Sequence, residues 1–280
     1  MSIAIIRALP IGNALQIYLQ PPAGAEYWRI LRKDADTFSG PDDTSAVVVH
    51  DGNNKMVVDD QAVANGAAYW YRAYYWTGSA WSASASESAS AAATYRDESI
   101  DAIEILRDRI EAGLKIEVQR GMLKHERGRI PVLLAPPVFE NSVFPIVTLH
   151  LQADSSTDRS AGEMKFPDVK TEDVFTEGEG WLAQTSITVM GWSTNPDERH
   201  ALRRSLKRII VGNLPVFDYH GMVTVDFHQQ DVEDFQSYNA PVYQTMGSFT
   251  CRTPTLVSDD VNGINDVQVQ GTSTYDEEGL

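Results

Sequence analysis

Cysteine, basic residues and long hydrophobic runs are all scarce in this chain of 280 residues. Cys251 is its single cysteine, which excludes an intrachain disulfide and any zinc site with several cysteine ligands. No apolar run approaches the roughly 20 residues that a membrane-spanning helix needs, so we expect no membrane partner. The N-terminal stretch lacks the basic start and small-residue cleavage site of a secretory signal, so we expect synthesis in the cytoplasm.

Basic residues are outnumbered by acidic ones, 23 against 39, and the formal net charge at pH 7 is −16. An acidic surface repels phosphate backbones, so we expect no sequence-specific nucleic-acid partner. Two interpretations of this charge stay open. It can maintain solubility at high local concentration, or it can form a surface that lies close to nucleic acid without binding it.

Motifs for catalysis and for metal binding are missing as well. None of the six histidines belongs to an HExxH pair or to a cysteine–histidine zinc set. The GxSxG motif of serine hydrolases and the glycine-rich phosphate loops are absent. We therefore predict that the protein is not an enzyme and that it needs no cofactor or metal.

The first 92 residues consist of short β-rich segments that alternate with turn residues. In "YWYRAYYW", residues 69–76, Tyr69 and Tyr71 fall on one face of an extended strand, and Trp70 and Tyr74 fall on the other. The regular spacing of the β-rich segments indicates an antiparallel β-sandwich. The expected strands are residues 3–9, 14–20, 27–33, 46–51, 55–60, 69–76 and 81–91.

The order "ALQIYLQPPAGAEYWRILRK", "VANGAAYWYRAYYW", "WSASASES" resembles a fibronectin type III domain over residues 1–92. The resemblance implies a tyrosine corner, in which the Tyr69 hydroxyl bonds to the preceding loop that begins at Val63. The tryptophan usual late in the second strand of that family is absent, and Leu19 stands there. We expect Trp28 or Trp70 to fill the core in its place.

A second interpretation of the aromatic segment is a binding face for sugars. Trp70, Tyr74 and Trp76 lie on one face of the expected strand, and exposed rings in such a row can stack on glycans. Core packing remains the first interpretation.

Residues 93–97 read as a short linker, and residues 98–257 read as an α+β domain. A helix is expected over 98–112, capped by Asp97 or Ser99 and ended by Gly113. Strands are expected at 114–121, 142–154 and 180–193. The acidic segment 154–180 is expected to be a solvated loop of 27 residues.

The clearest helix begins after Asn195, a good N-cap, with Pro196 at its first position. Its apolar residues recur at helical spacing and form a buried stripe: Leu202, Leu206, Ile209 and Ile210. Five cations are expected on the opposite side: Arg199, Arg203, Arg204, Lys207 and Arg208. They can form an ordinary solvated face or contact a phosphate or the acidic loop of another copy.

Two closing strands are expected at 222–235 and 240–256, followed by an acidic C-terminal arm over 258–280. The element order predicts an antiparallel sheet layered by two helices. The fold class is therefore a two-domain chain, a fibronectin type III-like all-β sandwich followed by an α+β domain.

The passages "SITVMGWSTNPDERHALRRSLKRII" and "VTVDFHQQDVEDFQSYNAPVYQTMGSFTCRTPTL", with the leading helix, resemble the tail-terminator and tail-completion proteins of long-tailed bacteriophages. The resemblance covers residues 95–257. It implies a homo-oligomeric ring, commonly hexameric, that caps the tail tube in the neck of the virion. The implied partners are the tail tube, the head-side connector and other tail proteins, and the five cations become candidate subunit-interface residues. An adhesion or glycan-binding virion protein is the alternative.

Overall fold

The computed structural model describes residues 2–138, 142–158, 168–171, 174–234 and 241–262. It is mostly β-sheet, divided among several sheets. The chain forms two compact units, the first built mainly on Met1–Arg96 and the second on Asp97–Thr171 with Phe175–Val257. We call them the N-terminal unit and the second unit, and each is described separately.

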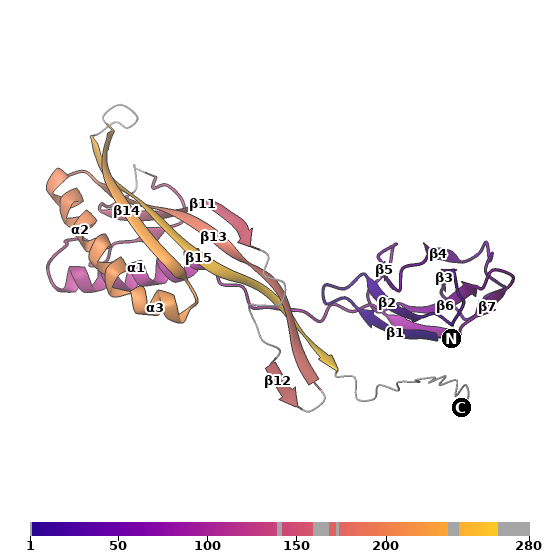
Figure 1. Cartoon of the computed structure of the whole chain (residues 1–280). Helices are drawn as coiled ribbons and strands as arrows, with labels where there is room; N and C mark the ends of the chain where they lie inside the picture. The colour runs from indigo at the N-terminus through magenta and orange to yellow at the C-terminus, as the bar shows by residue number, and fades with distance from the viewer. Residues whose placement is uncertain (1, 139–141, 159–167, 172–173, 235–240, 263–280) are drawn as a thin grey trace, which may run out of the picture. The chain divides into compact units, whose positions relative to one another are not determined.

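The N-terminal unit contains two antiparallel sheets (Figure 1). The smaller sheet has the order β1-β2-β5, from Ser2–Ala8, Leu15–Gln20 and Met56–Asp59. The larger has the order β4-β3-β6-β7, from Val47–Gly52, Tyr27–Lys33, Ala68–Trp76 and Trp81–Ala83, with β8, Glu87–Ser90, also paired to β6.

Alternation of apolar residues builds the core of this unit. Leu15 and Ile17 of β2 are buried together with Tyr71 and Tyr75 of β6 in one cluster. Trp28 is buried in the same cluster, whereas Trp70 is half-buried outside it, so Trp28 fills the core.

The expected final strand, 81–91, is broken in the structure, so that prediction was wrong in one respect. β7 ends at Ala83, and the Ser84 hydroxyl accepts a hydrogen bond from the Ala73 N–H at 3.0 Å. The Ser84 hydroxyl also donates to the Ala85 carbonyl at 2.6 Å. A serine side chain thus replaces part of the backbone ladder, and pairing resumes at β8.

The second unit places helices on one face of a long sheet (Figure 1). Its main strands have the order β10-β11-β13-β15-β14, with β12 beside β13 and β9 beside β15. Pairing is antiparallel for β11 with β13 and for β14 with β15, and parallel for β10 with β11. The strands are β9 Arg96–Asp97, β10 Val132–Leu133, β11 Ile146–Asp158, β12 Asp168–Thr171, β13 Val174–Ser193, β14 Val223–Asp234 and β15 Val242–Asn262.

Three helices are described in this unit, one more than expected: α1 Ala102–Gln119, α2 Pro196–Gly212 and the short α3 Leu214–Tyr219. Their apolar residues pack against the sheet in one cluster. Leu106 of α1, Leu206 of α2 and Phe217 of α3 meet Val189 of β13 and Phe249 of β15 there.

The predicted bounds of the first helix, and the strand predicted after it, were wrong. Asp101, rather than Asp97 or Ser99, caps α1 by accepting from the N–H groups of Ile103 and Glu104. The helix then continues through Gly113 to Gln119. A Cβ at Gly113 would lie 2.5 Å from Ile209 Cγ1, so this glycine permits the close approach of α2.

Much of the acidic segment 154–180 is strand, which corrects the predicted loop. β11 extends to Asp158 and β13 begins at Val174, while residues 159–167 and 172–173 lie outside the described residues. A Cβ at Gly180 would lie 2.3 Å from the Thr255 carbonyl oxygen. The glycines of "EGEG" therefore lie within β13, where the absence of a side chain lets β15 approach closely, and they do not mark a loop.

Strand pairing crosses the end of the predicted linker 93–97 and the predicted boundary at 257–258, although the two compact units divide after Arg96 and after Val257. Arg96–Asp97 form β9 beside β15, and β15 continues to Asn262. The predicted arm therefore begins inside a strand, and its residues 263–280 lie outside the described residues.

Candidate subunit-interface site

Helix α2 positions all five candidate interface cations, and local signals set its start. The Asn195 side chain accepts from the N–H groups of Asp197 and Glu198, and Pro196 occupies the first turn. The predicted buried stripe is confirmed: Leu202, Leu206, Ile209 and Ile210 are all buried. This stripe orients the rest of the helix surface.

Two of the cations are directed toward β14. Arg199 lies 3.0 Å from Glu233 and 3.7 Å from Asp231, and its guanidinium lies over the Tyr243 ring. Arg203 lies 3.8 Å from the same Asp231. The Arg199 side chain is only 13% exposed, so it ties α2 to the sheet and is not free for a partner.

A third cation joins α2 to α1. The Arg208 guanidinium contacts the buried Glu117 carboxylate, which also accepts a hydrogen bond from the buried Ser205 hydroxyl at 2.8 Å. Burial acts to raise the pKa of Glu117, but the hydrogen bonds from Arg208 and Ser205 outweigh it, and the net pKa is lowered. This network fixes the crossing of the two helices beside Gly113.

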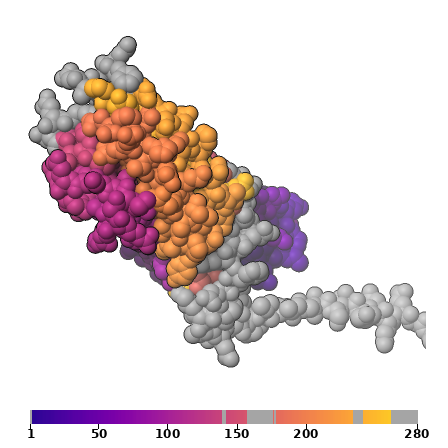
Figure 2. Space-filling view, turned by 90° about the vertical axis from the view of Figure 1, so that its left-hand side faces the viewer, coloured from indigo at the N-terminus to yellow at the C-terminus, as the bar shows by residue number. Residues whose placement is uncertain are grey.

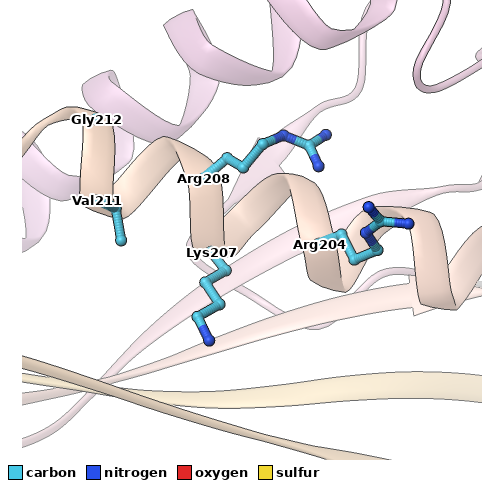
Figure 3. A pocket seen from close by; sticks show the side chains of 5 residues that line it. All are labelled: Arg204, Lys207, Arg208, Val211 and Gly212. Carbon is cyan, nitrogen blue, oxygen red and sulfur yellow. The ribbon is translucent and has the colours of Figure 1, made fainter.

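Arg204 and Lys207 differ from the other three. Both are exposed, and within the described part of the chain neither has an ion-pair partner. They line a shallow, open groove together with Arg208, Val211 and Gly212 (Figure 3). Lys207 and Arg208 extend on opposite sides of the helix there.

The expectation of five cations on one free face therefore needs correction. Charge pairing with β14 and α1 engages Arg199, Arg203 and Arg208, because acidic residues distant in sequence lie beside them. The free surface reduces to Arg204, Lys207 and the apolar Val211, which is 58% exposed. Figure 2 shows this side of the second unit, with α1 in magenta beside α2 in orange.

The aromatic residues considered for glycan stacking do not form one exposed row. Tyr74 is only 4% exposed, because residues 34–46 lie over this face of the sheet. Arg29, opposite Tyr74, bonds to the Pro41 carbonyl, and Arg72 lies over the Phe38 ring. Trp70 and Trp76 are half-buried. Trp76 contacts the ring of Trp81, at 5.5 Å between centroids, and this contact was not predicted from the sequence.

The expected corner residue, Tyr69, is buried, and its hydroxyl accepts a hydrogen bond from the Ala64 N–H at 3.0 Å. Val63, at the start of this loop, is buried in the core. The side chain of Tyr69 therefore ties the loop to β6.

A buried ionic network in the N-terminal unit was also missed. Arg32 Nη1 lies 2.7 Å from Asp59 Oδ2, and the Tyr71 hydroxyl donates to the same oxygen at 2.8 Å. Arg32 also lies over the Tyr69 ring at 4.9 Å. Burial, then the hydrogen bond to Asp59, raises the pKa of Tyr71. The signal in the sequence was alternation: Arg32 shares a strand face with Trp28 and Ile30, which are both buried.

The sequence of the chain was compared with protein-family profiles and with curated proteins. No protein-family profile matches it, and no curated protein matches its sequence. Among the described helices, none is long and apolar enough to cross a membrane. The described residues also contain no cluster of three or more histidine, cysteine or acidic side chains suited to a metal ion.

Proposed function

We propose that this protein is a structural virion protein of a tailed phage. It forms a homo-oligomeric ring at the neck, caps the tail tube and joins it to the head-side connector. The observation that carries the proposal is the one-sided sheet of the second unit. Helices pack on one face, where Ile187, Val189 and Cys251 are buried.

The other face of this sheet is mainly polar and half-exposed along the middle of β13 and β15, and at one end it carries a separate buried cluster of Ile146, Trp192 and Val242. Along β13 and β15, every second residue lies on this face, between the buried residues of the helix-covered face. These residues are Gln184, Ser186, Thr188, Met190, Ser248, Thr250 and Arg252. Ser186, Thr188, Ser248 and Thr250 are small hydroxyl residues, which permit close approach of another chain without burying a charge of their own. An open face on strands of 20 and 21 residues suits a subunit that is completed by neighbouring copies.

Charge supports the same proposal. A net charge of −16 suits a channel wall along which DNA slides without binding, because like charges repel the phosphate backbone. The acidic balance also disfavours tight nucleic-acid binding as the protein's own task.

The N-terminal unit is proposed to be a fibronectin type III-like module displayed on the particle. Two features support this assignment: the facing sheets of order β1-β2-β5 and β4-β3-β6-β7, and the hydrogen bond of Tyr69 to the loop before its strand. Such a module supplies an accessory surface and leaves ring formation to the second unit.

Negative-stain electron microscopy of the purified chain at high micromolar concentration tests the proposal. We expect ring-shaped particles with a central channel, and we expect the same rings at the ends of purified tail tubes. Particles that remain single subunits and leave tube ends bare would contradict the proposed function.

A further inference from the structure

Helix α1 carries a row of exposed acidic side chains that matches the free cations of α2. Glu104, Asp108 and Glu111 are exposed and follow one another at spacings of four and three residues, so they lie along one side of the helix. Asp108 lies 3.7 Å from Arg107, yet its side chain remains 62% exposed.

The acidic row is directed away from α2 of the same chain. The side of α1 that meets α2 is marked by Gly113, against Ile209, and by Glu117, against Ser205. At about 100° per residue, Asp108 and Glu111 lie roughly on the opposite side of the helix from these contacts. The row therefore cannot neutralise Arg204 and Lys207 within one chain.

The cations of α2 are the complementary half. In the described part of the chain, Arg199, Arg203 and Arg208 contact acidic side chains, whereas Arg204 and Lys207 do not. The exposed Val211 lines the same groove and adds apolar surface near the end of the helix. Unpaired charge beside exposed apolar side chains is typical of a protein-binding surface.

We infer that Arg204 and Lys207 of one copy bind the α1 acidic row, Glu104, Asp108 and Glu111, of the next copy. The inference rests on the proposed ring and names the contact that builds it. Two different surfaces of the same chain meet in this contact, so it is head-to-tail, and such contacts close into rings when the rotation between copies permits. A second copy is favoured as the occupant because it supplies the matching charges at matching helical spacing.

Two charge-reversal variants test the contact. In the first, Arg204→Glu and Lys207→Glu make both surfaces acidic; in the second, Asp108→Lys and Glu111→Lys make both surfaces basic. Each variant alone replaces attraction by repulsion, and we expect the concentration for half-assembly to rise at least about tenfold in sedimentation velocity. In a ring with an even number of copies, such as the expected hexamer, an equimolar mixture in which the two variants alternate restores a complementary pair at every contact, and assembly should return to the level of the unmodified chain.

A matched control carries the same change of charge elsewhere. Arg127→Glu and Arg129→Glu alter two exposed cations of the segment that follows α1, outside the groove, and should leave assembly within about twofold. Circular dichroism verifies that every variant is folded.

The outcomes separate this inference from the proposed function. If the unmodified chain assembles and both variants assemble equally well, the contact is wrong while the ring stands. If each variant fails alone and the mixture also fails, a pairing of these two surfaces is contradicted. If the unmodified chain stays monomeric throughout, both proposals are contradicted.

Discussion

The N-terminal unit and the second unit each contain a buried carboxylate paired with an arginine, but the two pairs differ in their access to water. Asp59 and Arg32 are both enclosed, with side-chain exposures of 0% and 7%. Glu117 is enclosed, but its partner Arg208 is 42% exposed. Inside a core, the loss of one partner leaves an unsolvated charge, whereas at a rim the surviving partner turns to water. Removal of the carboxylate should therefore cost more stability in the Asp59–Arg32 pair than in the Glu117–Arg208 pair.

The largest effect is expected for Asp59→Asn, which leaves the Arg32 charge in the core. We expect a loss of about 3–5 kcal/mol in the free energy of unfolding of the N-terminal unit. Native-state hydrogen exchange at the amides of β3 and β6 in the full chain measures it. Tyr71→Phe is the matched control, since it removes one hydrogen bond and no charge, and it should cost less. A loss below 1 kcal/mol for Asp59→Asn would contradict the claim that an enclosed arginine without its carboxylate is costly.

A smaller effect is expected for Glu117→Gln. Arg208 can rotate into solvent, so we expect a loss of only about 1–2 kcal/mol, discounted for the exposure of the arginine. Hydrogen exchange at the amides of α1 and α2 reports it. A loss equal to that of Asp59→Asn would show that exposure of the partner does not govern the cost.

The pH dependence of the Glu117–Arg208 pair sharpens the comparison further. Its hydrogen bonds lower the pKa of Glu117 in the folded chain below the unfolded value near 4.5. The resulting stability is present above that value and is lost as pH falls through the lowered pKa. The difference in unfolding free energy between the unmodified chain and Glu117→Gln should therefore shrink between pH 7 and pH 3. Urea titrations at both values check this, and a constant difference would contradict it.

The smallest effect is expected for Arg204→Ala, because this side chain has no ion-pair partner among the described residues. Its unfolding free energy should change by less than about 0.5 kcal/mol. Arg208→Ala, on the same helix, should cost more because it leaves Glu117 without its cation. Thermal unfolding of both variants measures the contrast, and equal losses would remove the distinction between the paired and free cations of α2.

Local signals in the sequence were enough wherever neighbouring residues determine the structure. Asn195 and Pro196 predict the start of α2, and the spacing of Leu202, Leu206 and Ile209 predicts its buried side. β3 has the predicted bounds, because its pattern of apolar residues and flanking turns lies within one short segment.

Prediction failed where a segment distant in sequence determines the local structure or burial. From local sequence, Gly113 is typical of a helix end and Gly180 is typical of a loop. In the structure, Gly113 permits close packing against Ile209 and Gly180 permits close approach of Thr255. Tyr74 is buried by a loop that the strand pattern does not reveal. The pairing of Arg199 with Glu233 depends on where β14 lies, which no local spacing encodes.

Native mass spectrometry of the unmodified chain over a range of concentrations tests the proposed ring most directly. Copies that join head to tail and close on themselves should appear as a single oligomer, with no larger assemblies above it. A persistent monomer, or an open ladder of masses that grows with concentration, would contradict the ring.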